Sequence, residues 1–375
     1  MKIGMTSTRF NTQGGIFRYA YELAHRLSLD YDMHVITGKN EDGKSKITFH
    51  NAPTLFSTIS SRVISNTLSS TVVGHRLKAK GIIDLVHGNG AEYIRPDVYT
   101  AHSVHKAAVD ISKKKRGWKY SLLKTFEPRT NVVLGIEKAN YTSLHNREVI
   151  AISNTVKEDI IKYYGVNPDK IHVIYNGVDI NEFKPIDDIR RGILRRNIGF
   201  LSDDIVAVFC GWEFKRKGLM QIIEALPSLS KKVKLLVLGS ADKRDFVKRA
   251  IELGVQDRIK FVGHVINPVE YYQASDLMIF PTSYEPFGLV ITEAMACGLP
   301  VVTSKCAGAS ELIKDGSDGM LLNNPYDVQE IIDSVGYIVD NDLLNKMGGN
   351  ARESILTYNW DATAKDTLKV YKEVL

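Results

Sequence analysis

Residues 284–300 form the stretch YEPFGLVITEAMACGLP, which directly follows a short apolar strand predicted over Leu277–Pro281. Glu285 lies in a loop that leads into an apolar helix predicted over Leu289–Cys297, and a second strand is predicted over Pro300–Ser304. Two short apolar strands joined by a helix predict a βαβ unit, whose strands lie parallel in one sheet. This stretch therefore predicts an α/β fold.

The same alternation extends outward along the chain in both directions. After residue 180, strands are predicted over Asp204–Gly211, Val233–Gly239 and Ile259–Gly263, with helices over Gly218–Leu229 and Asp242–Gly254. Before residue 180, strands are predicted over Lys2–Thr6, Met33–Thr37, Ile82–His87, Val149–Ser153 and Ile171–Tyr175, with helices over Ile16–Leu29 and Thr155–Tyr164. Strands that alternate with helices predict parallel sheets covered on both faces.

The pattern restarts near residue 180, where Asn176–Asp188 contains Gly177, Pro185 and an acidic pair. We therefore predict two doubly wound, Rossmann-like domains, 1–180 and 181–359, which face each other across a cleft. An amphipathic helix over about 360–375 is expected to pack back on the first domain. In folds of this kind, ligands bind at the carboxyl ends of the strands.

Composition excludes several classes of protein. The 375 residues are 44% hydrophobic and 25% charged, which argues against disorder, and no apolar run approaches the 18 residues of a transmembrane helix. The first ten residues have no long apolar core, so we expect no secretory signal. The three cysteines, Cys210, Cys297 and Cys306, form no CxxC motif, which favours a reducing cytoplasm over a disulfide framework.

Charge is distributed unevenly between the two halves. Residues 1–180 carry 25 Lys and Arg against 16 Asp and Glu, a net charge of +9. Residues 181–375 carry 24 against 27, a net charge of −3, and together these give the net charge of +6 for the whole chain. An excess of positive charge in one half indicates an anionic partner, of which nucleic acid and a membrane surface are the obvious candidates.

Two carboxylates and a helix start make up the first candidate site. Glu285 precedes the helix, and Glu293 lies about one turn inside it. Gly288 permits close backbone approach, and the free N–H groups of the first helical turn can hold a phosphate. Glu293 belongs to an apolar helix in which an unpaired carboxylate is costly, so we expect it to bind hydroxyl groups of a ligand rather than face solvent.

A basic loop makes up the second candidate site. Residues 211–218, GWEFKRKG, follow the first predicted strand of the second half and open a helix. Three cations, Lys215, Arg216 and Lys217, at the carboxyl end of a strand suit a diphosphate. A solvated basic loop is the alternative, but the position between strand and helix favours a functional site.

Three other motifs have simpler explanations. Gly38–Ser45 fits the phosphate-binding pattern GxxxxGK[ST], but β-branched residues follow and indicate a strand or loop where a P-loop requires a helix. Gly88-Asn89-Gly90 begins a dinucleotide fingerprint, but Tyr93 stands where the third Gly should be. His102 and His105 have no third ligand nearby in sequence, so we predict no metal site.

Together these features resemble the retaining glycosyltransferases of family 4, which have the GT-B fold. Glu285 and Glu293 match the E-x7-E motif of that family, and Arg216 and Lys217 match its Arg/Lys pair. Further matches are Gly14-Gly15 after the first strand, His102 after a later strand, the phrase Ile150–Ser153 and the hinge phrase Val173–Asp179. The resemblance covers nearly the whole chain and is nearest to the lipopolysaccharide core glucosyltransferases. The basic loop departs from the commoner family form, because Trp212 stands where an Arg follows the first Gly.

The resemblance implies roles for individual residues. In that family the Arg/Lys pair neutralises the donor diphosphate, the first carboxylate of E-x7-E holds hydroxyls of the transferred sugar, and the second holds the ribose. These roles fall here on Arg216 and Lys217, on Glu285 and on Glu293. The resemblance further implies backbone donors to the phosphates from Phe287, Gly288 and Leu289, space beside the diphosphate at Gly15, and a place near the transferred sugar for His102. It also implies retention of stereochemistry and, with cations doing the electrostatic work, no metal.

The acceptor side offers one further feature, a basic stretch with interleaved aromatic and Leu residues. Residues 99–130 carry eight Lys and Arg against two Asp and Glu, and Lys113–Lys119 contain most of the cations. Together with Trp118 and Tyr120 this stretch predicts docking on an anionic membrane, and a solvated loop is the alternative. We predict no nucleic-acid partner, because no recognised module accompanies the patch.

The predicted function is therefore that of a cytoplasmic, peripheral, metal-independent retaining glycosyltransferase. It would move a hexose from a nucleotide diphosphate sugar, with a UDP-sugar favoured, to a glycan or lipid-linked acceptor on the inner face of the cell membrane. The alternatives are a nucleotide-sugar epimerase of the same fold, a P-loop nucleotide-binding protein that uses Gly38–Ser45, and an inactive sugar-nucleotide-binding module.

Overall fold

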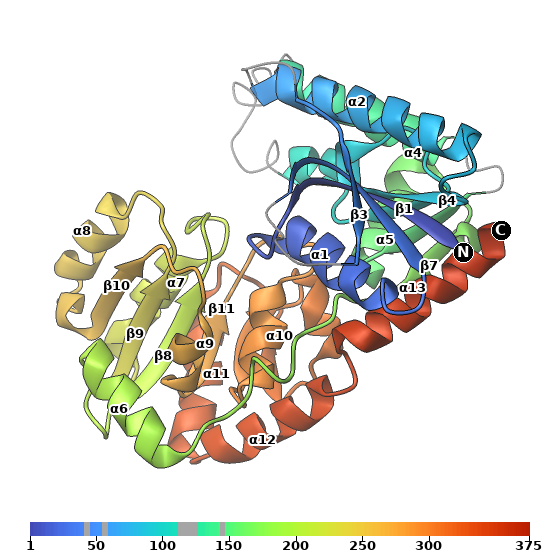
Figure 1. Ribbon diagram of the computed structural model, residues 1–375. Helices are drawn as coiled ribbons and strands as arrows, with labels where there is room; N and C mark the ends of the chain where they lie inside the picture. Colours follow the sequence, from blue (N-terminus) through green and yellow to red (C-terminus); the bar gives the residue numbers. More distant parts are fainter. Residues whose placement is uncertain (41–45, 55–58, 112–126, 143–146) are drawn as a thin grey trace. The chain divides into compact units, whose positions relative to one another are not determined.

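The chain folds into two compact units, each built around one parallel sheet (Figure 1). The structure is a computed structural model that describes residues 1–40, 46–54, 59–111, 127–142 and 147–375. The N-terminal unit comprises Met1–Gly177 and Trp360–Leu375, and the C-terminal unit comprises Val178–Asn359. Both ends of the chain therefore belong to the N-terminal unit.

The N-terminal unit contains a seven-stranded sheet of order β3-β2-β1-β4-β5-β6-β7, in which all neighbours are parallel. Its central strands are largely buried, as expected of a parallel sheet covered by helices, although Thr6, His87 and Thr100 place polar groups in this core. The strands are β1 (Lys2–Phe10), β2 (Asp32–Asn40), β3 (Thr48–Asn51), β4 (Leu85–Asn89), β5 (Val98–Ala101), β6 (Glu148–Ala151) and β7 (Ile171–Val173).

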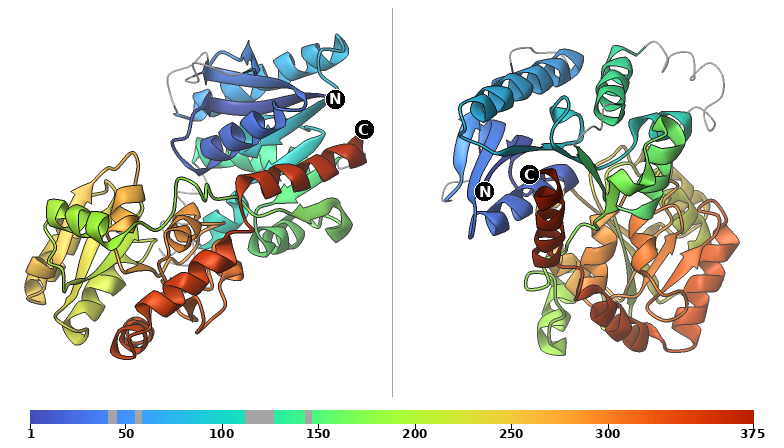
Figure 2. Two further views of the ribbon diagram at one scale, coloured as in Figure 1. Left: turned by 60° about the horizontal axis from the view of Figure 1, so that its bottom comes forward. Right: turned by 90° about the vertical axis from the view of Figure 1, so that its right-hand side faces the viewer.

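Helices cover both faces of this sheet. On one face α1 (Gly15–Leu27) packs against the terminal helix α13 (Trp360–Val374), as Figures 1 and 2 show. Arg26 of α1 donates to Asp361 of α13 at 2.6 Å. On the other face α2 (Ile59–Ala79) packs against α4 (Pro128–Tyr141), and α5 (Asn154–Tyr164) lies beside α4. Buried bonds also tie α13 to the sheet, because the Tyr371 hydroxyl lies 2.5 Å from Nδ1 of His87.

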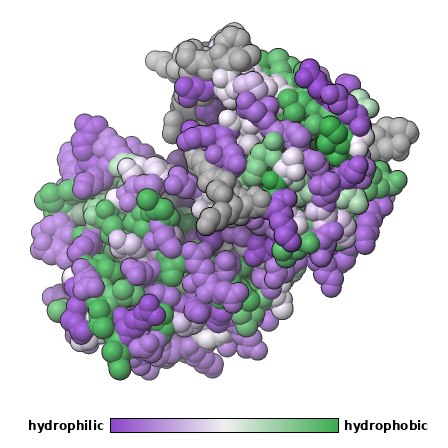
Figure 3. Space-filling view, viewed as in Figure 1, coloured by the Kyte–Doolittle hydropathy of each residue, from purple (hydrophilic) through white to green (hydrophobic). Residues whose placement is uncertain are grey.

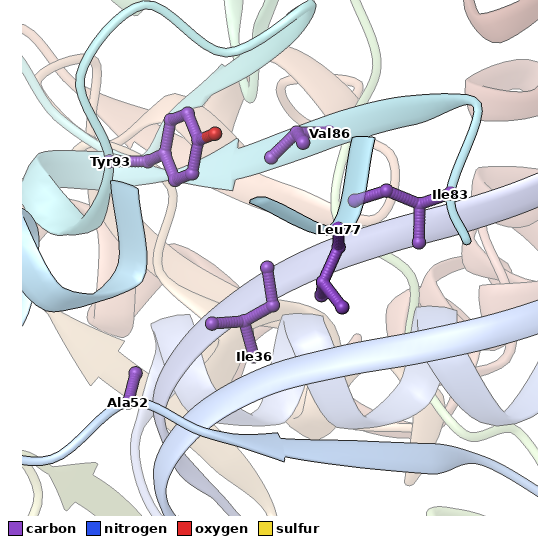
Figure 4. Close-up of a cluster of buried hydrophobic side chains, with 6 residues drawn as sticks. All are labelled: Ile36, Ala52, Leu77, Ile83, Val86 and Tyr93. Carbon is purple, nitrogen blue, oxygen red and sulfur yellow. The ribbon is translucent and has the colours of Figure 1, made fainter. Parts of the chain in front are cut away.

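One part of the core shows how segments distant in sequence come together. Leu77 of α2 packs with side chains from the sheet and from the turn that follows β4 (Figure 4). Burial of these apolar groups contributes roughly 25 cal/mol for each Å² removed from water, which fixes α2 on the sheet. The full cluster is Ile36, Ala52, Leu77, Ile83, Val86 and Tyr93.

The C-terminal unit contains a six-stranded parallel sheet of order β10-β9-β8-β11-β12-β13. The order reverses between β8 and β11, because the chain leaves β8 toward one edge of the sheet and leaves β11 toward the other. The strands are β8 (Ile205–Cys210), β9 (Val233–Leu238), β10 (Ile259–Gly263), β11 (Leu277–Phe280), β12 (Val301–Ser304) and β13 (Gly319–Leu322).

Two layers of helices enclose this second sheet. One layer contains α7 (Leu219–Ala225), α8 (Arg244–Glu252) and α11 (Val328–Asp340). The other contains α6 (Asp188–Ile198), α9 (Val269–Gln273), α10 (Leu289–Ala296) and α12 (Leu344–Ile355). Arg352 of α12 donates to the carbonyl oxygens of Ile180, Phe183 and Ala296, so a single guanidinium joins α12, α10 and the start of the unit.

The predicted α/β class with two parallel-sheet domains is confirmed. The helix predicted from the opening stretch begins at Leu289 as expected and ends one residue early, at Ala296. The strand predicted over Ile82–His87 runs instead over Leu85–Asn89, and Asp84 just before it accepts a hydrogen bond from the backbone N–H of Lys2. Sequence analysis missed α2, whose many Ser, Thr and Asn residues obscure its apolar face.

The residues after the P-loop-like motif form a strand. The described chain resumes at Lys46, and β3 follows over Thr48–Asn51 beside β2. Residues 41–45, which hold most of the motif, lie outside the described part of the chain. A phosphate-binding loop requires a helix at this point, so the observed strand argues against the P-loop alternative.

On the face drawn in Figure 3, hydrophilic residues predominate and hydrophobic residues form scattered patches. Among the described residues, no helix combines the length and apolar character needed to cross a bilayer.

Gly239, directly after β9, lies against the backbone of Gly211, so a substitution there measures how much this close approach matters to stability. It has φ +133°, and a Cβ atom there would lie 1.8 Å from the carbonyl oxygen of Gly211. We expect Gly239→Ala to lower stability by at least about 3 kcal/mol, because rigid backbone would have to move. The control Gly254→Ala also has positive φ, +67°, but open space around it, and should cost about 1–2 kcal/mol. Urea-unfolding midpoints measure both effects, and similar shifts would contradict this account.

Candidate active site

The principal candidate site lies at the carboxyl ends of β8 and β11, where the strand order of the C-terminal unit reverses. The loop after β8 contains Arg216 and Lys217, and the loop after β11 contains Glu285. Because β8 and β11 are neighbours and parallel, their following loops leave the sheet side by side. Such a point of reversal is where open α/β sheets bind ligands.

Lys217 and Glu285 form a largely buried ion pair at this point. Nζ of Lys217 lies 3.2 Å from Oε2 of Glu285, and the two side chains are 13% and 16% exposed. The ammonium also lies over the ring of Phe280, 5.0 Å from its centroid, in the geometry of a cation–π contact. Gly211 makes room for this side chain, because a Cβ there would lie 2.4 Å from Cδ of Lys217.

Arg216 contacts the same carboxylate oxygen. Its Nη1 lies 3.5 Å from Oε2 of Glu285 and donates to the carbonyl oxygen of Tyr284, while Nη2 donates to Glu213 at 2.7 Å. Burial alone would lower the pKa of Arg216, but Glu285 and Glu213 outweigh it and raise that pKa above its ordinary value. Arg216 therefore stands charged beside Glu285.

The start of α10 lies directly after Glu285. Gly288 caps the helix with φ +100°, and the carbonyl oxygen of Phe287 accepts a hydrogen bond from the N–H of Ala309. The N–H groups of Gly288 and Leu289 have no backbone acceptor in the described part of the chain. These donors suit an anion, which the positive end of the helix dipole also favours.

Glu293 is held deeper in the same helix. It is 7% exposed, and its Oε2 accepts a hydrogen bond from the Tyr272 hydroxyl at 3.3 Å. Burial raises the pKa of Tyr272 well above its usual range, so this phenol remains a donor. Sequence analysis did not identify Tyr272, whose only signal is its place in the short helix α9.

In the N-terminal unit, His102 is buried beneath the end of β5 and is 8% exposed. Its Nε2 lies 3.2 Å from Oδ1 of Asn89, and Nδ2 of Asn89 donates to the carbonyl oxygen of Thr6. The Asn89 oxygen therefore faces the imidazole, which places the proton on Nε2 and leaves Nδ1 as an acceptor. Burial lowers the pKa of His102 to about 3, so the imidazole is neutral at physiological pH.

Gly15 is the first residue of α1, and Gly14 before it has φ +92°. The loop after β1 thus turns tightly into the helix, as the sequence predicts. Gly15 and His102 both lie in the N-terminal unit, whereas Arg216, Lys217, Glu285, Phe287, Gly288, Leu289 and Glu293 lie in the C-terminal unit.

A further feature that sequence analysis missed is a cavity of about 620 Å³ within the N-terminal unit. His102 contributes to its wall, together with Thr8 of β1, Asn66 of α2 and Glu92 of the short turn η1 (Gly90–Glu92). Thr8, Asn66 and Glu92 are far apart in sequence, so no local motif connects them.

Elsewhere in this unit, ligand atoms of Glu148, His172 and Glu373 lie within 4.8 Å of one another. Lys170 donates to Glu148 at 2.5 Å, so a cation of the chain already lies beside this group. The predicted membrane-docking stretch, Lys113–Lys119, lies outside the described residues.

Comparison with known proteins now identifies the fold and the family. The sequence model "Glycosyl transferases group 1" matches residues 191–354, and "Glycosyltransferase Family 4" matches residues 13–182. The crystal structure of WaaG, a glycosyltransferase involved in lipopolysaccharide biosynthesis, has a TM-score of 0.81 at 22% identity, covering 98% of this chain and 99% of WaaG. These two parallel-sheet units therefore define a GT-B protein. The chain belongs to the GT-B glycosyltransferases of the family 4 type.

Two further proteins show similarity. The structure of Anabaena Alr3699/HepE in complex with UDP-glucose has a TM-score of 0.73 at 22% identity, covering 99% of each chain. A D-inositol 3-phosphate glycosyltransferase of Xylanimonas cellulosilytica is 32% identical over 240 residues, which is 60% of this chain. The chain spans 56% of the length of that curated relative.

The buried neutral His102 leads to a pH-dependent prediction. An unfolded histidine takes up a proton below a pKa of about 6.5, whereas folded His102 does so only near about 3. The unfolded state therefore binds more protons below about 6.5, and this residue lowers stability as the pH falls. We expect the wild type to lose about 1.4 kcal/mol relative to His102→Gln between pH of about 7.5 and about 5.5. Denaturant unfolding at both pH values measures this, and a constant difference would show that His102 is not buried as a neutral ring.

Proposed function

We propose that the chain transfers a hexose from a nucleotide diphosphate sugar to a glycan or lipid-linked acceptor, with retention of stereochemistry. The observation that carries this proposal is the cluster of Arg216, Lys217 and Glu285 beside the N-terminus of α10. Two cations and a helix start suit a diphosphate, and a carboxylate between them suits the hydroxyls of the sugar attached to it.

In this proposal the ion pairs rearrange when the donor binds. Lys217 and Arg216 now neutralise Glu285, at 3.2 and 3.5 Å. A bound diphosphate would compete for both cations and free the carboxylate to accept hydrogen bonds from sugar hydroxyls. Glu293, already fixed by Tyr272, would hold the ribose. Gly288 and Leu289 would donate backbone N–H groups to the phosphates.

The proposed chemistry follows from where charge develops. As the bond from the anomeric carbon to the diphosphate breaks, negative charge grows on the departing oxygen, and Lys217 and Arg216 stabilise it. The acceptor oxygen bonds to the anomeric carbon on the same face, and the departing phosphate oxygen takes the acceptor's proton. The proposal requires no metal, because these cations and the start of α10 supply the positive charge.

A UDP-sugar is the favoured donor. The Anabaena relative of the same fold was crystallised with UDP-glucose. Of the alternatives, the P-loop hypothesis conflicts with strand β3, and an epimerase would require an acid/base pair, for which the cluster of Arg216, Lys217 and Glu285 offers no evident candidate. Turnover of a nucleotide sugar would distinguish an enzyme from an inactive sugar-nucleotide-binding module.

Lys217→Ala should reduce turnover of the nucleotide sugar by roughly a hundredfold or more, because it removes a charge beside the departing diphosphate. The matched control is Lys215→Ala, two residues away, whose side chain is 71% exposed and pairs with Asp245. We expect that control to keep nearly wild-type turnover. Initial rates of transfer or of donor hydrolysis measure both, and equal losses would remove Lys217 from the proposed site.

Glu285→Ala should abolish most sugar transfer while UDP still binds, because the carboxylate is assigned to the sugar and the cations to the diphosphate. Thermal shift with UDP measures binding separately from turnover, because a ligand that binds only the native state raises the melting temperature. If the variant lost UDP binding as completely as transfer, the division of labour would be wrong.

We also propose that Lys113–Lys119 dock on an anionic membrane. Each basic residue near such a surface contributes about 1 kcal/mol, and salt screens this attraction to about 3 Å at 1 M. Vesicles with anionic lipid should therefore retain the protein, neutral vesicles should retain less, and high salt should release it. Changing Lys113, Lys114, Lys115 and Arg116 to Ser should weaken retention but spare donor hydrolysis. Equal sedimentation with both kinds of vesicle would leave a solvated loop as the explanation.

A further inference from the structure

Away from the candidate active site, an imidazole and two carboxylates converge beside β6 and β7 of the N-terminal unit. One ligand atom from each of Glu148, His172 and Glu373 lies within 4.8 Å of the other two. Glu148 is the first residue of β6, His172 lies in β7, and Glu373 belongs to the last turn of α13. The group therefore links the final helix of the chain to two strands of the sheet.

The register of the sheet and the packing of α13 bring these three residues together. β6 and β7 are parallel neighbours, and Ile150 of β6 is paired with His172 of β7. Side chains two residues apart on a strand point to the same face, so Glu148 and His172 share the face that carries Ile150. Helix α13 packs against β5 and β6 and brings Glu373 to His172 on that face.

The distances between these atoms fit ligands around a single ion. Oε2 of Glu148 lies 3.0 Å from Nε2 of His172, and Oε2 of Glu373 lies 3.5 Å from the same nitrogen. Zinc binds imidazole nitrogen and carboxylate oxygen at roughly 2.0–2.2 Å, so two ligands in tetrahedral geometry lie about 3.3–3.6 Å apart. Glu373, whose side chain is 54% exposed, has room to adjust its oxygen to such an ion.

Lys170 holds the buried carboxylate and leaves one of its oxygens for the ion. Nζ of Lys170 lies 2.5 Å from Oε1 of Glu148, whose side chain is only 7% exposed. The other oxygen, Oε2, faces His172. Metal-ligating carboxylates are commonly oriented by a hydrogen bond of this kind from a second residue. The ammonium therefore fixes Glu148 in a position from which Oε2 can bind a metal.

The charge of the group also favours a cation. Glu148 and Glu373 carry two negative charges when ionised and Lys170 carries one positive charge, so a negative charge remains beside His172. A metal bound to Nε2 requires the neutral imidazole with its proton on Nδ1. The ion would then take the place of the Nε2 proton between His172 and the two carboxylates.

We propose that Glu148, His172 and Glu373 bind a divalent transition-metal ion, for which Zn²⁺ is the best match. An imidazole beside two carboxylates suits zinc, whereas Mg²⁺ and Ca²⁺ prefer oxygen ligands alone. Glu148 lies at the amino end of β6, whereas His102 follows the carboxyl end of β5, so the ion lies at the opposite edge of the sheet from His102. Its role is to hold α13 on the sheet, and the inference is independent of the proposed function.

Calorimetry with ZnCl₂ on the full-length protein, stripped of metal with a chelator and then dialysed, tests the site. We expect saturable binding of Zn²⁺, and binding of Mg²⁺ or Ca²⁺ at least about a hundredfold weaker. His172→Gln and Glu373→Gln should each weaken Zn²⁺ binding at least about tenfold, because each removes one ligand. The Glu373 side chain is more than half exposed, so its variant should fold as the wild type does.

Two control variants assign the binding to this group. Asp366→Asn removes a carboxylate from the same helix, which is 50% exposed and pairs with Lys369 at 2.7 Å. His50→Gln removes an imidazole from another histidine pair of this unit, in which Nε2 of His50 lies 2.9 Å from Nδ1 of His34. Both controls should bind Zn²⁺ as tightly as the wild type does.

Thermal unfolding measures what the ion does for the fold. Saturating Zn²⁺ should raise the melting temperature of the wild type by at least about 3 °C, because an ion that binds only the native state stabilises it. The Glu373→Gln variant should show a clearly smaller rise. The proposal is overturned if Zn²⁺ does not bind the wild type, or if His172→Gln and Glu373→Gln bind it as tightly as the two controls do. The three side chains would then form only a hydrogen-bonded group of charges.

Discussion

The 3.2 Å ion pair between Lys217 and Glu285 depends on one constraint, which is that β8 and β11 lie side by side and parallel. Lys217 and Glu285 are far apart in sequence, and each follows its strand by only a few residues. A parallel sheet brings the carboxyl ends of its strands to one edge, so the two loops have to meet there. If the same two strands were antiparallel, their following loops would leave at opposite edges of the sheet, and the two charges would be separated by about the length of a strand.

Close packing of backbone maintains this arrangement. Gly211 and Gly239 leave no room for side chains where the loops after β8 and β9 meet, and Gly211 gives that space to the stem of Lys217. Beneath the loops, Phe280 provides the ring over which the ammonium lies. The cation is thus largely withdrawn from water, which strengthens its interaction with any anion that reaches it.

The two sheets share one topological feature, a reversal of strand order at a central pair of strands. In each, the strand order reverses at a central pair, β1 and β4 in one and β8 and β11 in the other, and polar side chains gather beyond that pair. In the C-terminal unit the cations already pair with Glu285, which suits a ligand that replaces one anion by another. In the N-terminal unit the polar groups beyond the pair line the cavity, where Thr8 holds Glu92 and Asn66. The same reversal therefore supports an ion-pair cluster in one unit and a polar cavity in the other.

The sequence by itself determined the α/β class, most strands and the elements that carry Arg216, Lys217, Glu285 and Glu293. These features are local. Consecutive residues are enough to show hydrophobic periodicity and the length of a loop between a strand and a helix. Sequence analysis could also place His102 after a strand, but it could not tell that burial keeps this ring neutral. Burial depends on Tyr19 and on residues from other strands that surround the ring.

Only the tertiary structure decided which distant side chains share a site. Tyr272 and Glu293 meet because α9 packs on α10, and Thr8, Asn66 and Glu92 meet because β1, α2 and η1 converge at one edge of the sheet. No spacing along the chain encodes these contacts, since their energy comes from burial and from hydrogen bonds between segments that are remote in sequence. The sequence therefore determined which elements carry the polar residues. The packing of sheets and helices determined which of these residues contact one another.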